Sequence, residues 1–185
     1  MVIKTGVPHK TIYIDGSEWT FNGHPNVGQV SDSKSNPKLR RGEPWINQEM
    51  YDYCQWYFKR ECYQIDADMG IIPLPFVAVD RYKSQYSGEK DIDILCMFGQ
   101  VNDGLRKEVV EVCTKLKSEG HRVLIGSGMS YEKYKEAIVK SYIVIDAWGG
   151  GDTCARFWEA TFNKSCLFSQ KYNILMPNKF TDAVN

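Results

Sequence analysis

Three polar residues with helical spacing follow a run of glycines in the last quarter of the chain. Asp152, Arg156 and Glu159 lie four and three positions apart, so a helix would place them on one face. A helix N-terminus preceded by glycines offers N–H groups and a partial positive charge that suit a phosphate. Arg156 would add a guanidinium there, and Glu159 could accept hydrogen bonds from two ribose hydroxyls. These residues therefore indicate a nucleotide-sugar site.

An exposed ion pair between Arg156 and Glu159, with Asp152 as the helix cap, is the alternative interpretation. Such a pair contributes only a few tenths of a kcal/mol to stability. The Asp152 carboxylate also complicates the phosphate hypothesis, because it would occupy the N-terminal N–H groups and repel a phosphate. We therefore expect Asp152 to cap the helix or to contact a sugar hydroxyl. Spacing alone does not decide between the ion pair and the nucleotide site.

The surrounding segments alternate between strand-like and helix-like patterns. Near-continuous apolar runs predict strands covered on both faces at 92–99, 122–126, 142–147 and 165–169. Helical periodicity predicts helices at 105–116, 130–138 and about 152–163. Strands and helices that alternate at this spacing require crossover connections, and hence a parallel sheet. Ligands bind such sheets at the carboxyl ends of the strands.

Glycines close three of these predicted strands at that edge, at Gly99, Gly126 and Gly149. A glycine lets the backbone approach a ligand where a Cβ atom would intrude. Simple turn geometry is the alternative for each position, and we favour it for Gly126. Arg106 follows Gly99 at the start of a predicted helix, which repeats the combination of a turn glycine and a cation.

The N-terminal half is less regular. Residues 11–16 predict a short strand that ends near Asp15, and the aromatic stretch from Asn47 predicts a helix leading into 58–61. Prolines at alternate positions in 71–76 exclude a central strand and predict an edge strand or a connector. We expect residues 21–44, which include His24, to form a long loop whose basic cluster is solvated.

Composition excludes several function classes. Lysine and arginine together equal aspartate and glutamate, at 23 each, so no basic excess indicates nucleic acid as a partner. The six cysteines form no CxxC pair, so we expect reduced thiols and no zinc or redox centre. The chain also lacks GxGxxG after Phe98 and lacks GxxxxGK[ST], which argues against nicotinamide, flavin and P-loop enzymes.

No signal-peptide pattern and no bilayer-length apolar run occur in the sequence. We therefore expect a cytoplasmic protein without a transmembrane segment. Work at a membrane surface and association into a homo-oligomer both stay open.

Several short motifs between Asp15 and Asn185 resemble glycosyltransferases of the GT-B fold, especially the spore-coat-protein-like and exostosin-like groups. The most specific is the glycine turn followed by Arg-Phe-Trp-Glu-Ala. The motifs are Phe58–Glu61, Pro73–Phe76, Ile92–Ile94 with Phe98–Gly99 and Arg106, a tyrosine-rich helix, Gly149–Asp152 and Arg156–Ala160.

The resemblance implies an α/β fold in which a Rossmann-like parallel sheet with flanking helices binds a nucleotide-diphosphate sugar. That donor lobe would occupy residues 89–185, and residues 1–88 would be part of an acceptor lobe, with the polar segment 82–90 as the boundary. A complete GT-B enzyme is roughly twice this length. We therefore expect a truncated or reduced member, whose donor lobe stops short at its C-terminus.

The resemblance also implies roles for individual residues. Glu159 would hold the donor ribose, Arg156 and Arg106 would neutralise the diphosphate, and the glycines would make room for it. Cationic side chains and a helix terminus would replace a metal, so no metal and no cofactor are expected. The implied donor-binding set is Gly99, Arg106, Gly149, Gly150, Gly151, Asp152, Thr153, Arg156 and Glu159.

The catalytic base and the acceptor are not identified by these motifs. Asp15 and His24 are candidates for the base by elimination, and the acceptor could be a glycan, a lipid or a protein. Two other classes of function stay open: a non-catalytic module that binds a nucleotide or nucleotide sugar, and a flavodoxin-like or receiver-like interaction domain.

Overall fold

The computed structural model describes residues 11–16, 46–74, 80–99, 104–147, 153–172 and 174–175. The chain divides into two compact units. Among the described residues, the first unit holds those up to Leu74 together with Tyr172, Ile174 and Leu175, and the second holds 80–147 and 153–171. The sequence-based boundary at residue 88 stays a prediction.

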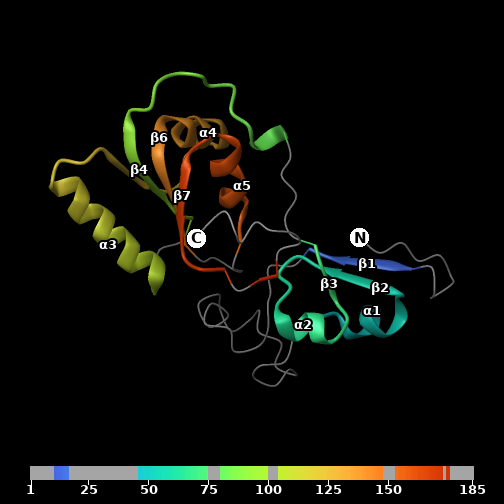
Figure 1. The fold of residues 1–185 in the computed structure, drawn as a ribbon. Helices are drawn as coiled ribbons and strands as arrows, with labels where there is room; N and C mark the ends of the chain where they lie inside the picture. Colours follow the sequence, from blue (N-terminus) through green and yellow to red (C-terminus); the bar gives the residue numbers. More distant parts are fainter. Residues whose placement is uncertain are drawn as a thin grey trace. The chain divides into compact units, whose positions relative to one another are not determined.

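The first unit is a three-stranded parallel sheet with helices on one face (Figure 1). The strands β1 (Ile12–Asp15), β2 (Trp56–Lys59) and β3 (Ile72–Pro73) lie in the order β1-β2-β3. Pro73 therefore lies in an edge strand, as the alternating prolines predict. The helices are α1 (Gln48–Tyr53) and α2 (Gln64–Asp68).

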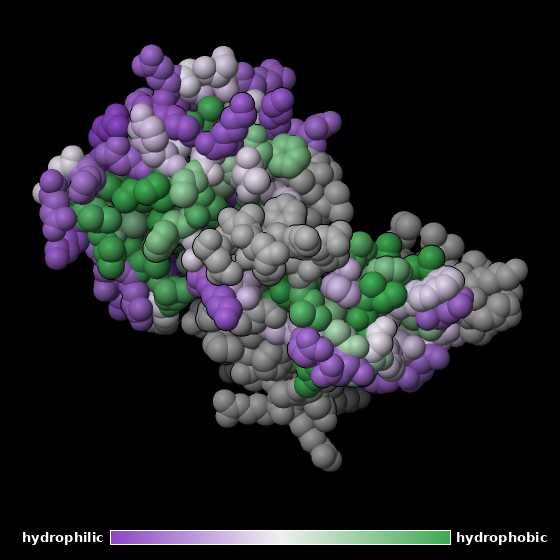
Figure 2. Space-filling model, viewed as in Figure 1, coloured by the Kyte–Doolittle hydropathy of each residue, from purple (hydrophilic) through white to green (hydrophobic). Residues whose placement is uncertain are grey.

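Helices cover one face of this sheet, and the other face is partly exposed. The helices enclose a core of Met50, Tyr57, Cys62 and Ile71. The opposite face carries the half-exposed side chains of Ile12, Ile14 and Trp56, and apolar residues are visible over β1 and β2 in Figure 2.

The predicted helix in the aromatic stretch is short. It begins at the Asn47 cap, whose side chain accepts a hydrogen bond from the Met50 N–H at 3.1 Å, and it ends at Tyr53. Residues 56–59 form a strand, so their side chains alternate between its two faces, and Tyr57 and Lys59 are buried.

The second unit contains four parallel strands, in the order β5-β4-β6-β7. These are β4 (Ile92–Met97), β5 (Val123–Gly126), β6 (Ser141–Asp146) and β7 (Cys166–Ser169). Numbered within this sheet the order is 2-1-3-4, which matches the first four strands of the flavodoxin-like order 2-1-3-4-5. It also matches the classic Rossmann order 3-2-1-4-5-6 without its third and sixth strands. In both cases the connections change direction between β4 and β6. The switch point, where open parallel sheets bind ligands, therefore lies at the carboxyl ends of these two strands.

Helices cover both faces of this sheet (Figure 1). On one face, α3 (Leu105–Ser118) packs on a core that includes Cys96, Phe98, Val123 and Ile145. On the other, α4 (Tyr131–Lys140) and α5 (Ala155–Phe162) pack on a core of Leu95, Met97, Ile138, Val144 and Ala160. A 3-10 turn, η4 (Asp80–Tyr82), precedes β4.

The ends of these helices follow the local sequence signals only in part. Gly120 adopts a φ of 99° just after α3, which is the conformation that a glycine stop provides. Ser130 is the cap residue of α4, although its side chain makes no capping hydrogen bond. Helix α5 begins at Ala155, later than the start near residue 152 that its periodicity predicts, and its cap residue is Cys154 rather than Asp152.

Candidate functional site

Arg156 lies at the switch point and connects three elements there. Its Nη2 donates to the carbonyl oxygen of Met97 at the end of β4, at 2.7 Å. Its Nη1 donates to Asp146 Oδ1 at the end of β6, at 3.1 Å, and its Nε donates to the Tyr134 hydroxyl of α4, also at 3.1 Å. One side chain from the first turn of α5 therefore joins both central strands to a neighbouring helix.

The ion pair between Arg156 and Asp146 is nearly buried, with side-chain exposures of 13% and 2%. Although burial alone lowers the pKa of Arg156, the nearby Tyr134, Cys154 and Asp146 outweigh it and raise that pKa above its ordinary value. The Cys154 thiol donates to the same Asp146 oxygen at 3.1 Å. Burial, followed by the Asp146 charge, raises the pKa of Cys154 to about 12, so the thiol is neutral at physiological pH.

Arg106 reaches the same edge from the opposite face of the sheet. It is the second residue of α3, and its Nη2 lies 3.4 Å from the carbonyl oxygen of Ala147, just past β6. Its guanidinium carbon lies over the ring of Phe98, 5.2 Å from the centroid, and that of Arg156 lies over the same ring at 5.0 Å. The structure thus brings together the two arginines that the resemblance assigns to a diphosphate.

Glu159 is 4% exposed, so the polar face predicted for α5 is covered rather than solvated. Its Oε1 accepts a hydrogen bond from the Tyr131 hydroxyl of α4 at 3.1 Å. Burial raises the pKa of Glu159, while hydrogen bonds from Tyr131 and Tyr134 partly offset that shift. Arg156 pairs with Asp146, and the side chains of Arg156 and Glu159 are both largely buried. The exposed Arg156–Glu159 ion pair therefore does not form.

The glycine positions are described only in part. Gly99 is exposed after β4, and a Cβ atom built there would have open space around it. Thr153 is buried just before α5. Gly149, Gly150, Gly151 and Asp152 lie outside the described residues, so their proposed contacts with a donor stay predictions.

The two candidates for the catalytic base lie in the N-terminal part of the chain. Asp15 ends β1 in the first unit, is buried, and accepts a hydrogen bond from the Tyr57 hydroxyl at 2.8 Å. Lys59, its neighbour in register on β2, forms a fully buried ion pair with Asp66 at 2.8 Å. His24 lies outside the described residues.

Three residues at the site were not singled out from the sequence for this role: Phe98, Tyr134 and Asp146. Asp146 carried the clearest signal, because an acid at the end of a buried parallel strand lies at the edge where ligands bind. Phe98 and Tyr134 read as ordinary core positions of a strand and a helix. Nothing in their spacing indicates that they contact Arg156.

Two further findings concern the described ranges. No group of three or more His, Cys, Asp or Glu side chains there is arranged to hold a metal ion. None of the described helices combines the length and the apolar character needed to cross a membrane.

Comparisons with protein-family models, with curated protein sequences and with solved structures find no match for this chain. The geometry of the switch point is therefore the basis for inferring the function.

Proposed function

We propose that the second unit binds the diphosphate of a nucleotide sugar and serves as the donor-binding part of a glycosyltransferase. The observation that carries this proposal is the convergence of Arg106 and Arg156 at the carboxyl ends of β4 and β6. Glycosyl transfer leaves negative charge on the departing diphosphate, and fixed cations aimed at that charge are an effective means of stabilising it.

Arg156 keeps donors available for a ligand. A guanidinium carries five N–H groups, and the hydrogen bonds to Met97, Asp146 and Tyr134 use one on each nitrogen. One N–H on each terminal nitrogen remains. The first turns of α3 and α5 contribute partial positive charge at the same edge, which favours an anion further.

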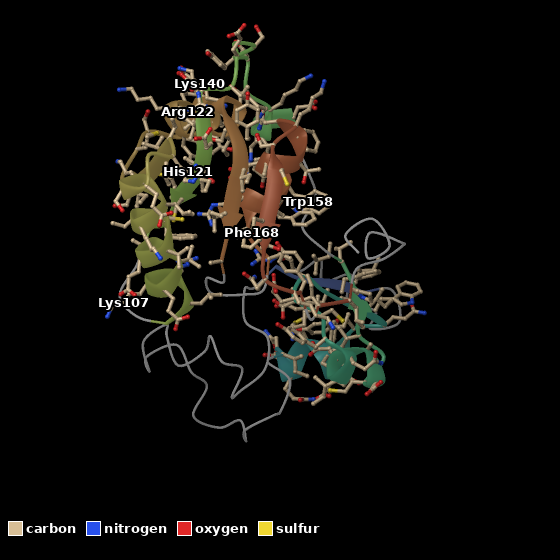
Figure 3. The ribbon with its side chains drawn as sticks, turned by 60° about the vertical axis from the view of Figure 1, so that its left-hand side comes forward. Lys107, His121, Arg122, Lys140, Trp158 and Phe168 are labelled. Carbon is tan, nitrogen blue, oxygen red and sulfur yellow. The ribbon has the colours of Figure 1, made fainter. Side chains whose placement is uncertain are left out.

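Isothermal titration calorimetry tests the proposal with uridine, guanosine and thymidine diphosphates and their sugar derivatives. We expect at least one diphosphate to bind, and Arg106→Gln to weaken its affinity about tenfold or more, because a charge-assisted hydrogen bond is lost. The matched control is Arg122→Gln. Arg122, labelled in Figure 3, pairs with Asp93 near the start of β4, whereas the switch point lies at the end of β4.

The results separate the alternatives. If neither the diphosphates nor their sugars bind, the donor-site proposal is wrong. If Arg122→Gln weakens binding as much as Arg106→Gln, the ligand does not bind at the switch point.

A non-catalytic nucleotide-binding module is the second candidate function. The hydrogen bonds that the carboxylates near the switch point already accept favour it. Asp146 already accepts hydrogen bonds from Arg156 and Cys154, and Glu159 accepts one from Tyr131. Neither is placed as an accessible general base. An assay for sugar release and transfer decides between the candidates: binding without hydrolysis or transfer supports the module, and turnover supports the enzyme.

A further inference from the structure

Phe98 contacts both arginines of the proposed donor site. It follows the last residue of β4, its N–H donates to the Gly126 carbonyl at 3.2 Å, and the residue is 1% exposed. Its ring packs in the core between the sheet and α3, with Cys96, Cys113 and Ala147 among its neighbours. Backbone and ring are therefore held by the fold rather than by a ligand.

Two like charges meet at this ring. Arg106 comes from α3 and Arg156 from α5, on opposite faces of the sheet, and their guanidinium carbons lie over the ring at 5.2 Å and 5.0 Å from its centroid. Two guanidiniums that contact the same ring repel each other, whereas the negative face of an aromatic ring attracts a cation. The ring thus opposes the repulsion that would drive the arginines apart.

We propose that Phe98 is a positioning residue that sets the spacing of Arg106 and Arg156 so that they bind the two phosphates of a diphosphate together. This inference rests on the proposed function, because it assigns a role within the same site. Two guanidiniums held at a fixed separation match a ligand with two anionic groups and give a single phosphate no such advantage. The site is therefore expected to prefer pyrophosphate over orthophosphate, and the preference depends on the ring.

Site-specific incorporation of mono-, di- and trifluorinated phenylalanine at position 98 tests the role of the ring. Fluorination withdraws charge from the ring face with little change in shape, so packing is nearly retained while the attraction for cations decreases. The probes are inorganic pyrophosphate, orthophosphate and uridine diphosphate, measured by calorimetry. We expect pyrophosphate affinity to fall stepwise, about tenfold across the series, with a much smaller change for orthophosphate.

The control series places the same analogues at Phe168, a β7 residue that is 65% exposed (Figure 3). Thermal unfolding of every analogue confirms that the fold is retained. Carbon-13 spectra of labelled arginine side chains supply a second readout, because the ring shifts the resonances of Arg106 and Arg156. We expect Phe98→Leu to remove both ring-induced shifts.

The possible outcomes are distinct. If the unmodified protein binds neither pyrophosphate nor any nucleoside diphosphate, the proposed function fails and the inference fails with it. If it binds them and fluorination at position 98 leaves pyrophosphate affinity unchanged, only the role of Phe98 is wrong. Equal losses for orthophosphate and pyrophosphate also overturn it, because the ring would then not set a spacing.

Discussion

The guanidiniums of Arg106 and Arg156 lie over the same phenyl ring although the two residues belong to helices on opposite faces of a sheet. Each arginine is the second residue of its helix. Helical side chains lean toward the N-terminus of their helix, and both of these helices begin at the carboxyl edge of the sheet. The two cations therefore meet at the switch point between β4 and β6.

The buried ion pair between Asp146 and Arg156 predicts a large cost for the loss of one partner. Asp146→Asn leaves the Arg156 guanidinium buried beside a neutral group, so the free energy of unfolding should decrease by about 3–5 kcal/mol. Urea unfolding measures the change. Asp93→Asn, which removes the partner of exposed Arg122, is the control and should cost about 1 kcal/mol or less. Equal costs for the two variants would show that the Asp146 pair is not important for stability.

Cys154 and Cys166 should differ sharply in reactivity. Burial and the nearby Asp146 raise the pKa of Cys154 to about 12, whereas Cys166 is exposed on β7. Only thiolates react readily with iodoacetamide, so at pH 8 Cys166 should be alkylated well before Cys154. Mass spectrometry of peptides after timed labelling measures both rates in one sample. Labelling of Cys154 at the rate of Cys166 in the folded protein would contradict the buried geometry around Asp146.

The raised pKa of Glu159 predicts that the free energy of unfolding depends on pH. Its pKa is raised, mainly by burial, although Tyr131, Tyr134 and Arg156 face it and oppose the shift while Asp146 adds to it. Because the pKa in the folded state lies above that in the unfolded chain, the folded protein binds this proton more tightly between the two values. The free energy of unfolding therefore falls as the pH rises through that window.

Glu159→Gln keeps the shape of the side chain and removes its titration. We expect the variant to lose part of the decline in stability above the ordinary pKa of 4.5. Urea unfolding between pH 4 and pH 8 measures the slope. Glu132→Gln, on the exposed side of α4, is the control and should leave the slope unchanged. Identical slopes for the wild-type protein and Glu159→Gln would contradict the raised pKa.

Donor binding should not require a divalent cation, because guanidiniums would supply the positive charge at the diphosphate. We expect the affinity for the best-binding nucleoside diphosphate to be the same, within about twofold, in excess EDTA and in millimolar magnesium. Calorimetry under the two conditions compares them directly. A tenfold loss in EDTA would show that a metal, rather than Arg106 and Arg156 alone, neutralises the phosphates.

Local patterns were sufficient to predict most elements of the second unit. The apolar runs that became β4 and β6 and the periodicity that became α3 depend only on residues close together in the sequence. The edge strand at Pro73 follows from the missing N–H of proline. The end of α1 at Tyr53 was harder to predict from the sequence, because aromatic residues are compatible with a helix and with a strand.

Arg156 and Glu159 show what the amino-acid sequence alone determined and what it left to the tertiary structure. Helical spacing placed both residues on one face of α5, because that depends only on helix geometry. Their partners depended on the packing of distant segments. Met97 and Tyr134 meet Arg156, and Tyr131 covers Glu159, only once β4 and α4 have packed beside α5. An apparently solvated polar face thus became a buried network, because the long-range packing of helices and strands decides which polar groups lose their water.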